Sequence, residues 1–474
     1  MSVITLIPGL ICLLMLASGS LRKVLLSVYL PTLLLLPTYY VARLAHLPPL
    51  SFSDAVALPL GIALFYTLGR RWHFSWMDLW VFLYAFAVVL SEGLSTELAD
   101  GNWVHLLSTG LTASQRVGTN IADSGLMFFR NLLTIVFPYM VGKLMLEQPD
   151  ASGQNARRPF VLRFCTLLSI VGWYSIVDFV TKRNSWMRVG SILFPSQESG
   201  WPQMVRWGFG RIAGPYGHAI LAGMIFLIGL IYCIWFLQSE PTWGQRRLIK
   251  SLPITQRTLL LGGVALGLLM AQSRGPWMGM GLSLVFLLLN RYLPPLKAGL
   301  VFLAFLSLFG TASYVYGKHY TDKEITQAVN EEQRNVIYRR NLLKNYAPLV
   351  AERPIFGWGI TTYPTVHGQR SIDNQYLLLA LTEGAFGLGL FLLIALGSLW
   401  KMLRLIMRPI DEETRRLAFA HISVFIGLLT SLATVYMGEQ VVMLFFLMAG
   451  WVQSMHPKAP GDGWTAGARF RILT

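Results

Sequence analysis

Hydrophobic residues along this chain occur in long blocks separated by short polar stretches. The blocks approach the roughly 20 apolar residues of a transmembrane helix and lack the alternation, over about 10 residues, of an outer-membrane strand. Thirteen blocks are visible, at 4–18, 24–42, 55–68, 77–94, 126–146, 161–180, 219–237, 258–272, 277–290, 298–316, 376–399, 417–436 and 441–452. The pattern predicts an all-α polytopic membrane protein. The first and third blocks are the weakest, so the expected number of transmembrane helices is twelve or thirteen.

The composition supports a membrane protein. Of the 474 residues, 54% are hydrophobic and 13% are charged, against about 25% charged in soluble proteins. These proportions exclude a soluble enzyme and a disordered chain. The net charge of +16 would suggest a nucleic-acid partner in a soluble protein. Here it fits Lys and Arg flanking helices on the cytoplasmic side, so we expect no nucleic-acid partner.

We expect a single membrane domain over residues 1–474, since no linker divides the chain. Cys12, Cys165 and Cys233 are isolated in apolar blocks and suggest neither a disulfide framework nor a metal site. The first block lacks a basic leader and a small-residue cleavage site. We therefore interpret it as a retained helix and not as a signal peptide.

The distribution of basic residues predicts the orientation. They concentrate in alternate connections between the blocks, at 22–23, 70–71, 157–158, 246–247 and 401–416. The positive-inside rule places this set in the cytoplasm. The two long segments at about 182–214 and 317–375 then face outward, the second as one large external loop. Because long polar loops of membrane proteins often carry the chemistry, we expect the active site there.

Several arginines remain on the unfavoured side. Arg211 precedes a new helix, Arg274 lies in a tight turn between two blocks of about 15 residues, and Arg130 lies one or two turns inside the fifth block. An arginine at membrane depth is costly without a partner or a wet cavity. Each can snorkel or pair with Glu383 or Glu439. As a group they indicate an anion site, because guanidinium forks bind phosphate oxygens bidentately.

The large loop contains a predicted amphipathic helix over 334–350. Its apolar face is expected to hold Val336, Tyr338, Leu342, Leu343, Tyr346, Leu349 and Val350. Arg339 falls inside this face, either as a stem packed on apolar surface or as a ligand contact. Pro354 ends the helix, and Gly357-Trp358-Gly359 predicts a flexible turn.

A polar stretch from His367 to Asn374 leads into the eleventh block. Asp373, near Arg370, is either the N-cap of that helix or a catalytic base. His367 is the second titratable candidate, although a lone loop histidine is usually only solvated. The sequence contains no HExxH, paired CxxC, Walker or GxGxxG motif, so nothing indicates metal hydrolysis, ATP or a dinucleotide, and we expect no cofactor.

Four stretches, in this order, resemble the bacterial O-antigen ligase and O-antigen polymerase family. They are RIAGPYGH at 211–218, SRGPW at 273–277, PIFGWG at 354–359, and DNQYL at 373–377 running on to Glu383-Gly384. The resemblance covers about residues 125–455. It implies a metal-independent glycosyltransferase of the inner membrane, active on the periplasmic face. The implied substrates are an undecaprenyl-pyrophosphate-linked glycan donor and a glycan or lipid A core acceptor, with other polysaccharide-assembly proteins as further partners.

The family's arginines bind pyrophosphate, which corresponds to Arg211 and Arg274 by motif and to Arg339 by loop position. Ligases of the family carry His-Asn where this chain has Asp373-Asn374. Related membrane glycosyltransferases of cell-wall synthesis place an Asp in a comparable role. The candidate set is therefore Asp373 and His367 for catalysis, Arg211, Arg274, Arg339 and Arg130 for pyrophosphate, and His218, Asn374 and Glu383 as further site residues.

The resemblance favours a polymerase of lipid-linked repeat units of a surface polysaccharide or exopolysaccharide. The first alternative is a ligase that moves a finished glycan onto lipid A core or protein. A lipid-linked sugar flippase or transporter is the second alternative. Inverted repeats and short loops are typical of transporters. This sequence shows no repeat, and most of its polar residues lie in the long outer loops.

Overall fold

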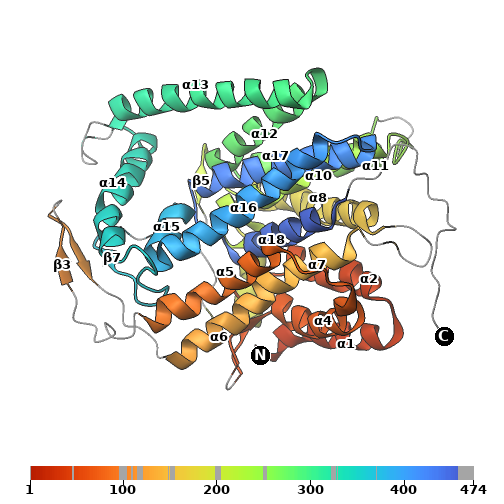
Figure 1. Ribbon diagram of the computed structural model, residues 1–474, viewed down its shortest axis with the longest axis horizontal. Helices are drawn as coiled ribbons and strands as arrows, with labels where there is room; N and C mark the ends of the chain where they lie inside the picture. Colours follow the sequence, from red (N-terminus) through yellow and green to blue (C-terminus); the bar gives the residue numbers. More distant parts are fainter. Residues whose placement is uncertain are drawn as a thin grey trace.

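The structure is a computed structural model and describes residues 2–44, 47–94, 104–107, 110–114, 121–147, 149, 155–197, 204–248, 253–321, 327, 329–369 and 371–456. Arg370 lies outside these residues. The described part is a bundle of helices with three very small sheets (Figure 1).

Each of the thirteen hydrophobic blocks forms helix. The helices are α1 (Ile7–Ser18), α2 (Leu21–Val24), α3 (Leu30–Leu35), α4 (Phe52–Leu68), α5 (Trp76–Gly93), α6 (Ile121–Asn131), α7 (Phe137–Met145), α8 (Arg157–Thr181), α9 (Ser185–Leu193), α10 (Ala219–Ser239), α11 (Gln256–Met270), α12 (Arg274–Tyr292), α13 (Pro295–Thr321), α14 (Glu331–Glu352), α15 (Gln375–Thr382), α16 (Gly384–Ile406), α17 (Glu412–Leu432) and α18 (Glu439–Ser454). Three 3-10 turns are η1 (Ser2–Leu6), η3 (Gly69–Arg71) and η6 (Gly214–Tyr216).

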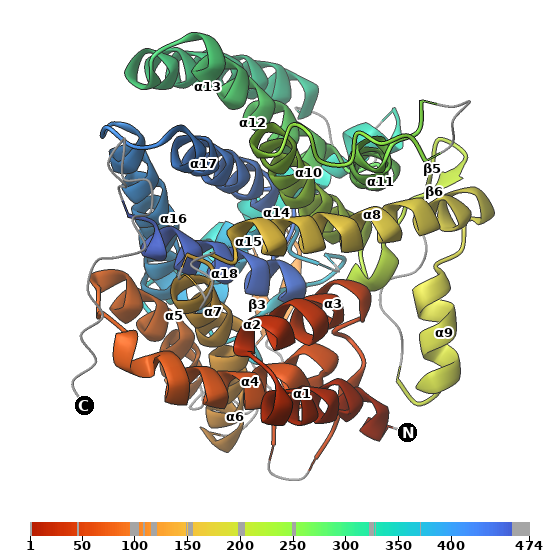
Figure 2. The same cartoon turned by 90° about the vertical axis from the view of Figure 1, so that its right-hand side faces the viewer.

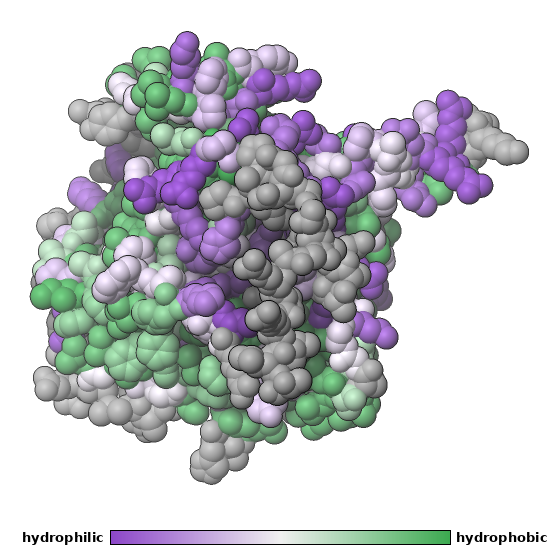
Figure 3. All heavy atoms as spheres, turned by 45° about the vertical axis from the view of Figure 1, so that its right-hand side comes forward, coloured by the Kyte–Doolittle hydropathy of each residue, from purple (hydrophilic) through white to green (hydrophobic). Residues whose placement is uncertain are grey.

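Seven apolar helices in the described part are long enough to cross a membrane, and three shorter apolar helices accompany them. This confirms the all-α polytopic membrane fold. On the face shown in Figure 3, hydrophobic side chains cover a broad area and hydrophilic side chains gather toward one side. That separation is expected where hydrocarbon, and not water, surrounds the middle of the molecule.

Two helices continue through π-helical turns. One turn, η2 (Leu25–Tyr29), joins α2 to α3, and the other, η5 (Leu132–Val136), joins α6 to α7. Pro31 and Pro138 are each the second residue after one of these turns. Because proline has no N–H and clashes with the carbonyl one turn earlier, the wider turn lets each helix continue. The helix of the second block nevertheless ends at Leu35, earlier than the predicted 42.

The eleventh block was predicted as one helix over 376–399, which is wrong. The helix breaks at Glu383, where α15 ends and α16 begins, and Gly384 has φ of 64°. The segment 354–359 fills the break: the amides of Trp358 and Gly359 donate to the carbonyls of Leu381 (2.8 Å) and Thr382 (2.9 Å). The predicted flexible turn at 357–359 is therefore a fixed part of the helix break.

Small sheets cover the end of the bundle that carries the large loop. Strand β1 (Val41–Ala42) pairs with β2 (Leu50–Ser51), β5 (Val205–Arg206) with β6 (Phe209–Gly210), and β4 (Thr112–Ser114) with both β3 (Val104–Leu106) and β7 (Thr365–Val366), all antiparallel. Beneath the three-stranded sheet, α14 and α15 share a second hydrophobic core around Tyr346 and Trp358. This core fixes α14 over the bundle.

The predicted face of α14 needs correction. Ile337, Leu342, Tyr346 and Leu349 are buried, but Val336 and Leu343 are 36% and 51% exposed. The buried stripe is thus rotated slightly from the one expected. The physical reason is that α14 packs on the small sheet and α15 at once, and so buries the side that touches both.

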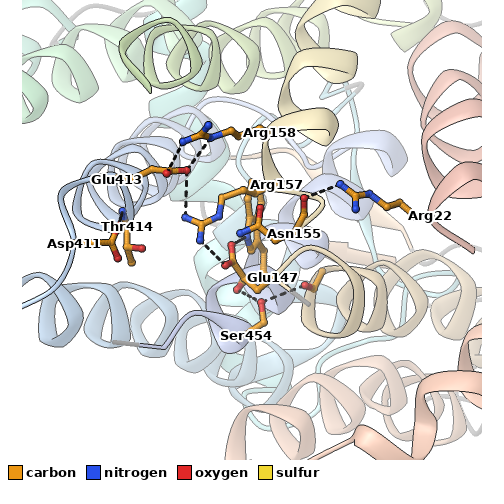
Figure 4. Close-up of polar contacts among 11 residues, drawn as sticks. Arg22, Glu147, Asn155, Arg157, Arg158, Asp411, Glu413, Thr414 and Ser454 are labelled. Atoms are coloured by element: carbon orange, nitrogen blue, oxygen red, sulfur yellow. Dashed lines mark hydrogen bonds and ion pairs between the residues drawn. The ribbon is translucent and has the colours of Figure 1, made fainter. Parts of the chain in front are cut away.

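Ion pairs connect the helices at the opposite end of the bundle (Figure 4). The buried Arg157 guanidinium lies 3.2 Å from Glu147 and 3.6 Å from Glu413, and Arg158 Nη2 lies 2.6 Å from Glu413. Arg22 donates to the Asn155 carbonyl at 2.6 Å. The basic connections predicted to share one side of the membrane therefore meet in space.

Candidate functional site

The turn between α11 and α12 is the centre of the candidate site. Gln272 adopts a left-handed conformation with φ of 47°, and Arg274 is the first residue of α12. Helix α11 has 15 residues as expected, but α12 has 19, more than its hydrophobic block. The N-terminus of α12 carries the positive end of the helix dipole, which favours an anion beside Arg274.

Arg211 reaches this turn from the loop after β6. Its Nη2 donates to Ser273 Oγ at 2.7 Å, and its Nε to the Ala271 carbonyl at 3.3 Å. Burial, with the positive charges of Arg206 and Arg339, lowers the pKa of Arg211 to about 10. The guanidinium stays charged at neutral pH, within a positive potential that a bound anion would relieve.

Arg339 reaches the same place from α14. Its Nη2 donates to the Thr434 carbonyl at 3.2 Å, and Thr434 also packs directly against Gly275 of the central turn. Burial lowers the pKa of Arg339; the negative charge of Asp373 opposes this, and the positive charge of Arg274 adds to it. The positive charges of three arginines from three distant segments therefore affect one another.

Asp373 lies at the edge of this group and is not a helix cap. The N-cap of α15 is Asn374, whose Oδ1 accepts from the Leu377 amide at 3.1 Å. Asp373 Oδ1 instead accepts from Ser371 Oγ at 2.8 Å. The prediction that Asp373 caps this helix is therefore wrong, because α15 begins one residue later than that prediction requires.

His218 is the N-cap of α10, with Nδ1 accepting from the Ile220 amide at 3.2 Å. Burial and the positive charge of Arg211 lower the pKa of His218 to about 4. Its imidazole is therefore neutral at physiological pH. His218 therefore caps α10 as a neutral acceptor and adds no positive charge beside Arg211.

Three other candidates lie elsewhere. Arg130 forms an ion pair with Glu439, one of the two partners considered for it. His367 is exposed at the end of β7, where its amide donates to Thr112. Glu383 lies in the helix break, and its Oε2 is buried without a hydrogen bond from the described residues. These contacts, with Glu439, Thr112 and the helix break, belong to other parts of the bundle than the turn between α11 and α12.

Sequence reasoning missed residues that orient the site. Tyr338 of α14 donates to the Ser371 carbonyl at 2.9 Å, and Ser371 orients Asp373. Gln375 Oε1 accepts from the Met437 amide at 2.6 Å and ties α15 to the segment before α18. A serine two residues before an aspartate is a weak local signal for the hydrogen bond between Ser371 and Asp373. Nothing in the sequence pointed to the contact between Gln375 and Met437.

Metal ligands are not grouped in the described residues: no set of three His, Cys, Asp or Glu side chains is arranged there to hold an ion. The conspicuous charged groups near the central turn are guanidinium groups and one carboxylate. Such a site can bind a polyvalent anion and accept a proton from a neighbouring hydroxyl.

Comparison with known proteins identifies one family. A family model described as O-antigen ligase matches residues 258–392, a stretch that includes Arg274, Arg339 and Asp373. A search of curated proteins finds no significant match. The family match confirms the resemblance to the O-antigen ligase and polymerase family.

Proposed function

We propose that this chain, a multi-pass membrane protein with an O-antigen ligase family region at 258–392, is a glycosyltransferase of the bacterial inner membrane. It would polymerise undecaprenyl-pyrophosphate-linked repeat units of a surface polysaccharide. Arg211, Arg274 and Arg339 would bind the pyrophosphate, and Asp373 would act as the base.

The proposal depends on one observation. The guanidinium groups converge on the turn between α11 and α12, where their positive charges affect one another, and the Asp373 carboxylate lies beside them. Arg211 bonds to Ser273, and the charges of Arg274 and Asp373 both act on Arg339. Like charges repel, so their convergence favours a ligand that is itself multiply negative. A pyrophosphate offers several oxygens to guanidinium forks.

The chemistry follows from this arrangement. Asp373 takes the proton of an acceptor sugar hydroxyl while its oxygen forms a bond to the anomeric carbon of the donor. The bond from that carbon to the pyrophosphate oxygen breaks, and the electron pair leaves with undecaprenyl pyrophosphate. The arginines and the N-terminus of α12 stabilise the charge that develops on the leaving group. The oxygen Oδ2 of Asp373 accepts no hydrogen bond from the described residues and is available for the proton.

The family match by itself also fits a ligase, and gene deletion separates the two reactions. If the chain is a polymerase, deletion leaves single lipid-linked repeats. If it is a ligase, long lipid-linked chains accumulate without a final acceptor. Unchanged glycans in the deletion strain would contradict both reactions and return attention to a lipid-linked sugar transporter.

Cysteine labelling of intact spheroplasts tests the proposed periplasmic site. The native cysteines Cys12, Cys165 and Cys233 are buried and give little background. Lys344 is exposed on α14, so Lys344→Cys should react with an impermeant reagent in intact spheroplasts. Arg408→Cys in the opposite set of connections should react only after membrane disruption. The reverse pattern would invert the topology.

A further inference from the structure

An apolar pocket lies outside the arginine site and is lined by residues of the end of α3, the C-terminal half of α8 and the short helix α9. Figure 2 shows how these three helices are arranged. Its volume is about 450 Å³, within the usual range of ligand sites, about 300–1,000 Å³. Leu35, Tyr40, Val171, Tyr174, Val189 and Leu193 are among its lining residues. The lining is almost entirely hydrocarbon and aromatic, so the pocket suits a hydrocarbon ligand.

The walls of the pocket are fixed by specific contacts. Gly190 of α9 packs against the Tyr40 ring so closely that a Cβ would not fit. Trp186 Nε1 donates to the Leu35 carbonyl at 2.9 Å and ties α9 to the end of α3. The pocket is therefore formed by the fold itself.

The mouth of the pocket faces the surroundings of the bundle. Tyr174 and Val189 are 47% and 56% exposed, and Ile170 is 55% exposed. These side chains belong to a membrane helix and to the amphipathic helix beside it. In a bilayer, hydrocarbon meets them, so a lipid chain can enter without crossing water.

The inner wall adjoins the segment that carries Arg211. Val171 Cγ1 lies 3.5 Å from the position of a Cβ on Gly214, and Asn184 Nδ2 donates to the Gly214 carbonyl at 3.2 Å. Gly214 follows Arg211 by three residues, which span at most about 11 Å. The apolar pocket and the cationic site are therefore neighbours.

We propose that this pocket binds the first isoprenoid units of the polyprenyl chain of the donor, while the arginines bind its pyrophosphate. The inference rests on the proposed function. An anionic head followed by a branched hydrocarbon matches a cationic cluster followed by a preformed apolar pocket. Transfer of a chain from bilayer to pocket yields little hydrophobic free energy, since lipid is equally apolar. The pocket thus acts by shape, holding the head group in register and selecting an isoprenoid chain.

Tryptophan scanning of α9 tests the proposal. Val189→Trp and Leu193→Trp fill the pocket, whereas Ile192→Trp places the same side chain on an exposed position of α9 that does not line it. The KM for an undecaprenyl-linked donor should rise about tenfold in the two filling variants, with kcat nearly unchanged. A donor whose pyrophosphate carries a methyl group in place of the polyprenyl chain puts nothing into the pocket, so all three variants and the wild type should use it equally.

A second measurement does not depend on transfer. Undecaprenyl phosphate bearing a diazirine in its first isoprene units should label peptides of α8 and α9 in the wild-type protein, and Val189→Trp should remove this labelling. Any of three results would overturn the pocket proposal. They are labelling outside α8 and α9, an equal loss of activity with both donors in the filling variants, and a co-purified phospholipid in the pocket together with unchanged donor kinetics. If wild-type protein transfers from neither donor, the proposed function fails, and the labelling still decides what the pocket binds.

Discussion

The hydroxyl of Ser371 donates a hydrogen bond of 2.8 Å to Oδ1 of Asp373. Tyr338 in turn donates to the carbonyl of Ser371 at 2.9 Å, so the amphipathic helix α14 orients the carboxylate through one residue. Ser371 therefore orients the Asp373 carboxylate, and α14 in turn holds Ser371.

Removal of this hydrogen bond should slow transfer. Ser371→Ala removes the contact that holds the Asp373 carboxylate in place, so kcat should fall while the KM for the donor stays nearly unchanged. Ser191→Ala, which removes an exposed hydroxyl that bonds only within α9, is the matched control and should leave both constants unchanged. Equal kcat values for the two variants would show that Ser371 does not position Asp373.

Asp373 and Asn374 should separate catalysis from stability. Asp373→Asn should abolish transfer at normal stability, because an amide cannot accept the proton and α15 keeps its cap. Asp373→His should retain some activity, since imidazole is a competent base near neutral pH. Asn374→Ala should cost about 1 kcal/mol of stability through loss of the cap. Transfer assays and thermal melts of the purified variants measure both effects; an active Asp373→Asn enzyme would move the base elsewhere.

Transfer should require the guanidinium groups of Arg211 and Arg274, because each can form two parallel hydrogen bonds to phosphate oxygens. Arg211→Ala and Arg274→Ala should each lower kcat/KM about 100-fold, the typical loss for one preorganised donor to a developing anion. Lysine at either position should restore activity only partly, because a point charge replaces a bidentate fork. Arg188→Ala, on the exposed side of α9, is the control. Wild-type rates for both lysine variants would contradict bidentate binding.

The ion pairs at the opposite end of the bundle should affect stability and not transfer. Arg157 is 3% exposed, and its loss removes a buried cation from beside Glu147, so Arg157→Met should destabilise by about 3 kcal/mol. The exposed pair of Arg416 with Glu412 should contribute about 0–1 kcal/mol, so Arg416→Ala should be nearly neutral. Thermal midpoints in detergent compare the two; similar midpoints would mean that the buried pairs add little.

His218 should make stability depend on pH. Its pKa falls from 6.5 to about 4 on folding because of burial and the charge of Arg211. Between these values the unfolded chain binds a proton that the folded chain does not, so stability should fall as the pH drops from 6.5 to 4 and change little below that. His218→Asn replaces the Nδ1 acceptor of the cap with an amide oxygen and should flatten this part of the curve. An unchanged slope would assign the dependence to other groups.

The sequence by itself determined the membrane fold, and it drew attention to the arginines that the structure brings to the turn between α11 and α12. Hydrophobic blocks of helix length admit few other structures in a bilayer, because every backbone polar group must be paired within the segment. The arginines stood out because charge at membrane depth is costly and therefore rarely incidental. Both conclusions depend on local composition, which a sequence displays directly.

Only the tertiary structure decided which charges meet. Arg130 and Arg211 look alike along the chain, yet one pairs with Glu439 and the other reaches Ser273, 62 residues away in sequence. The break at Glu383 depends on backbone hydrogen bonds from 354–359, and the cap of α15 falls on Asn374 because the helix begins one residue after Asp373. Ion pairs, helix breaks and caps are decided by which distant groups offer a partner, and hydrophobic periodicity holds no information about that partner.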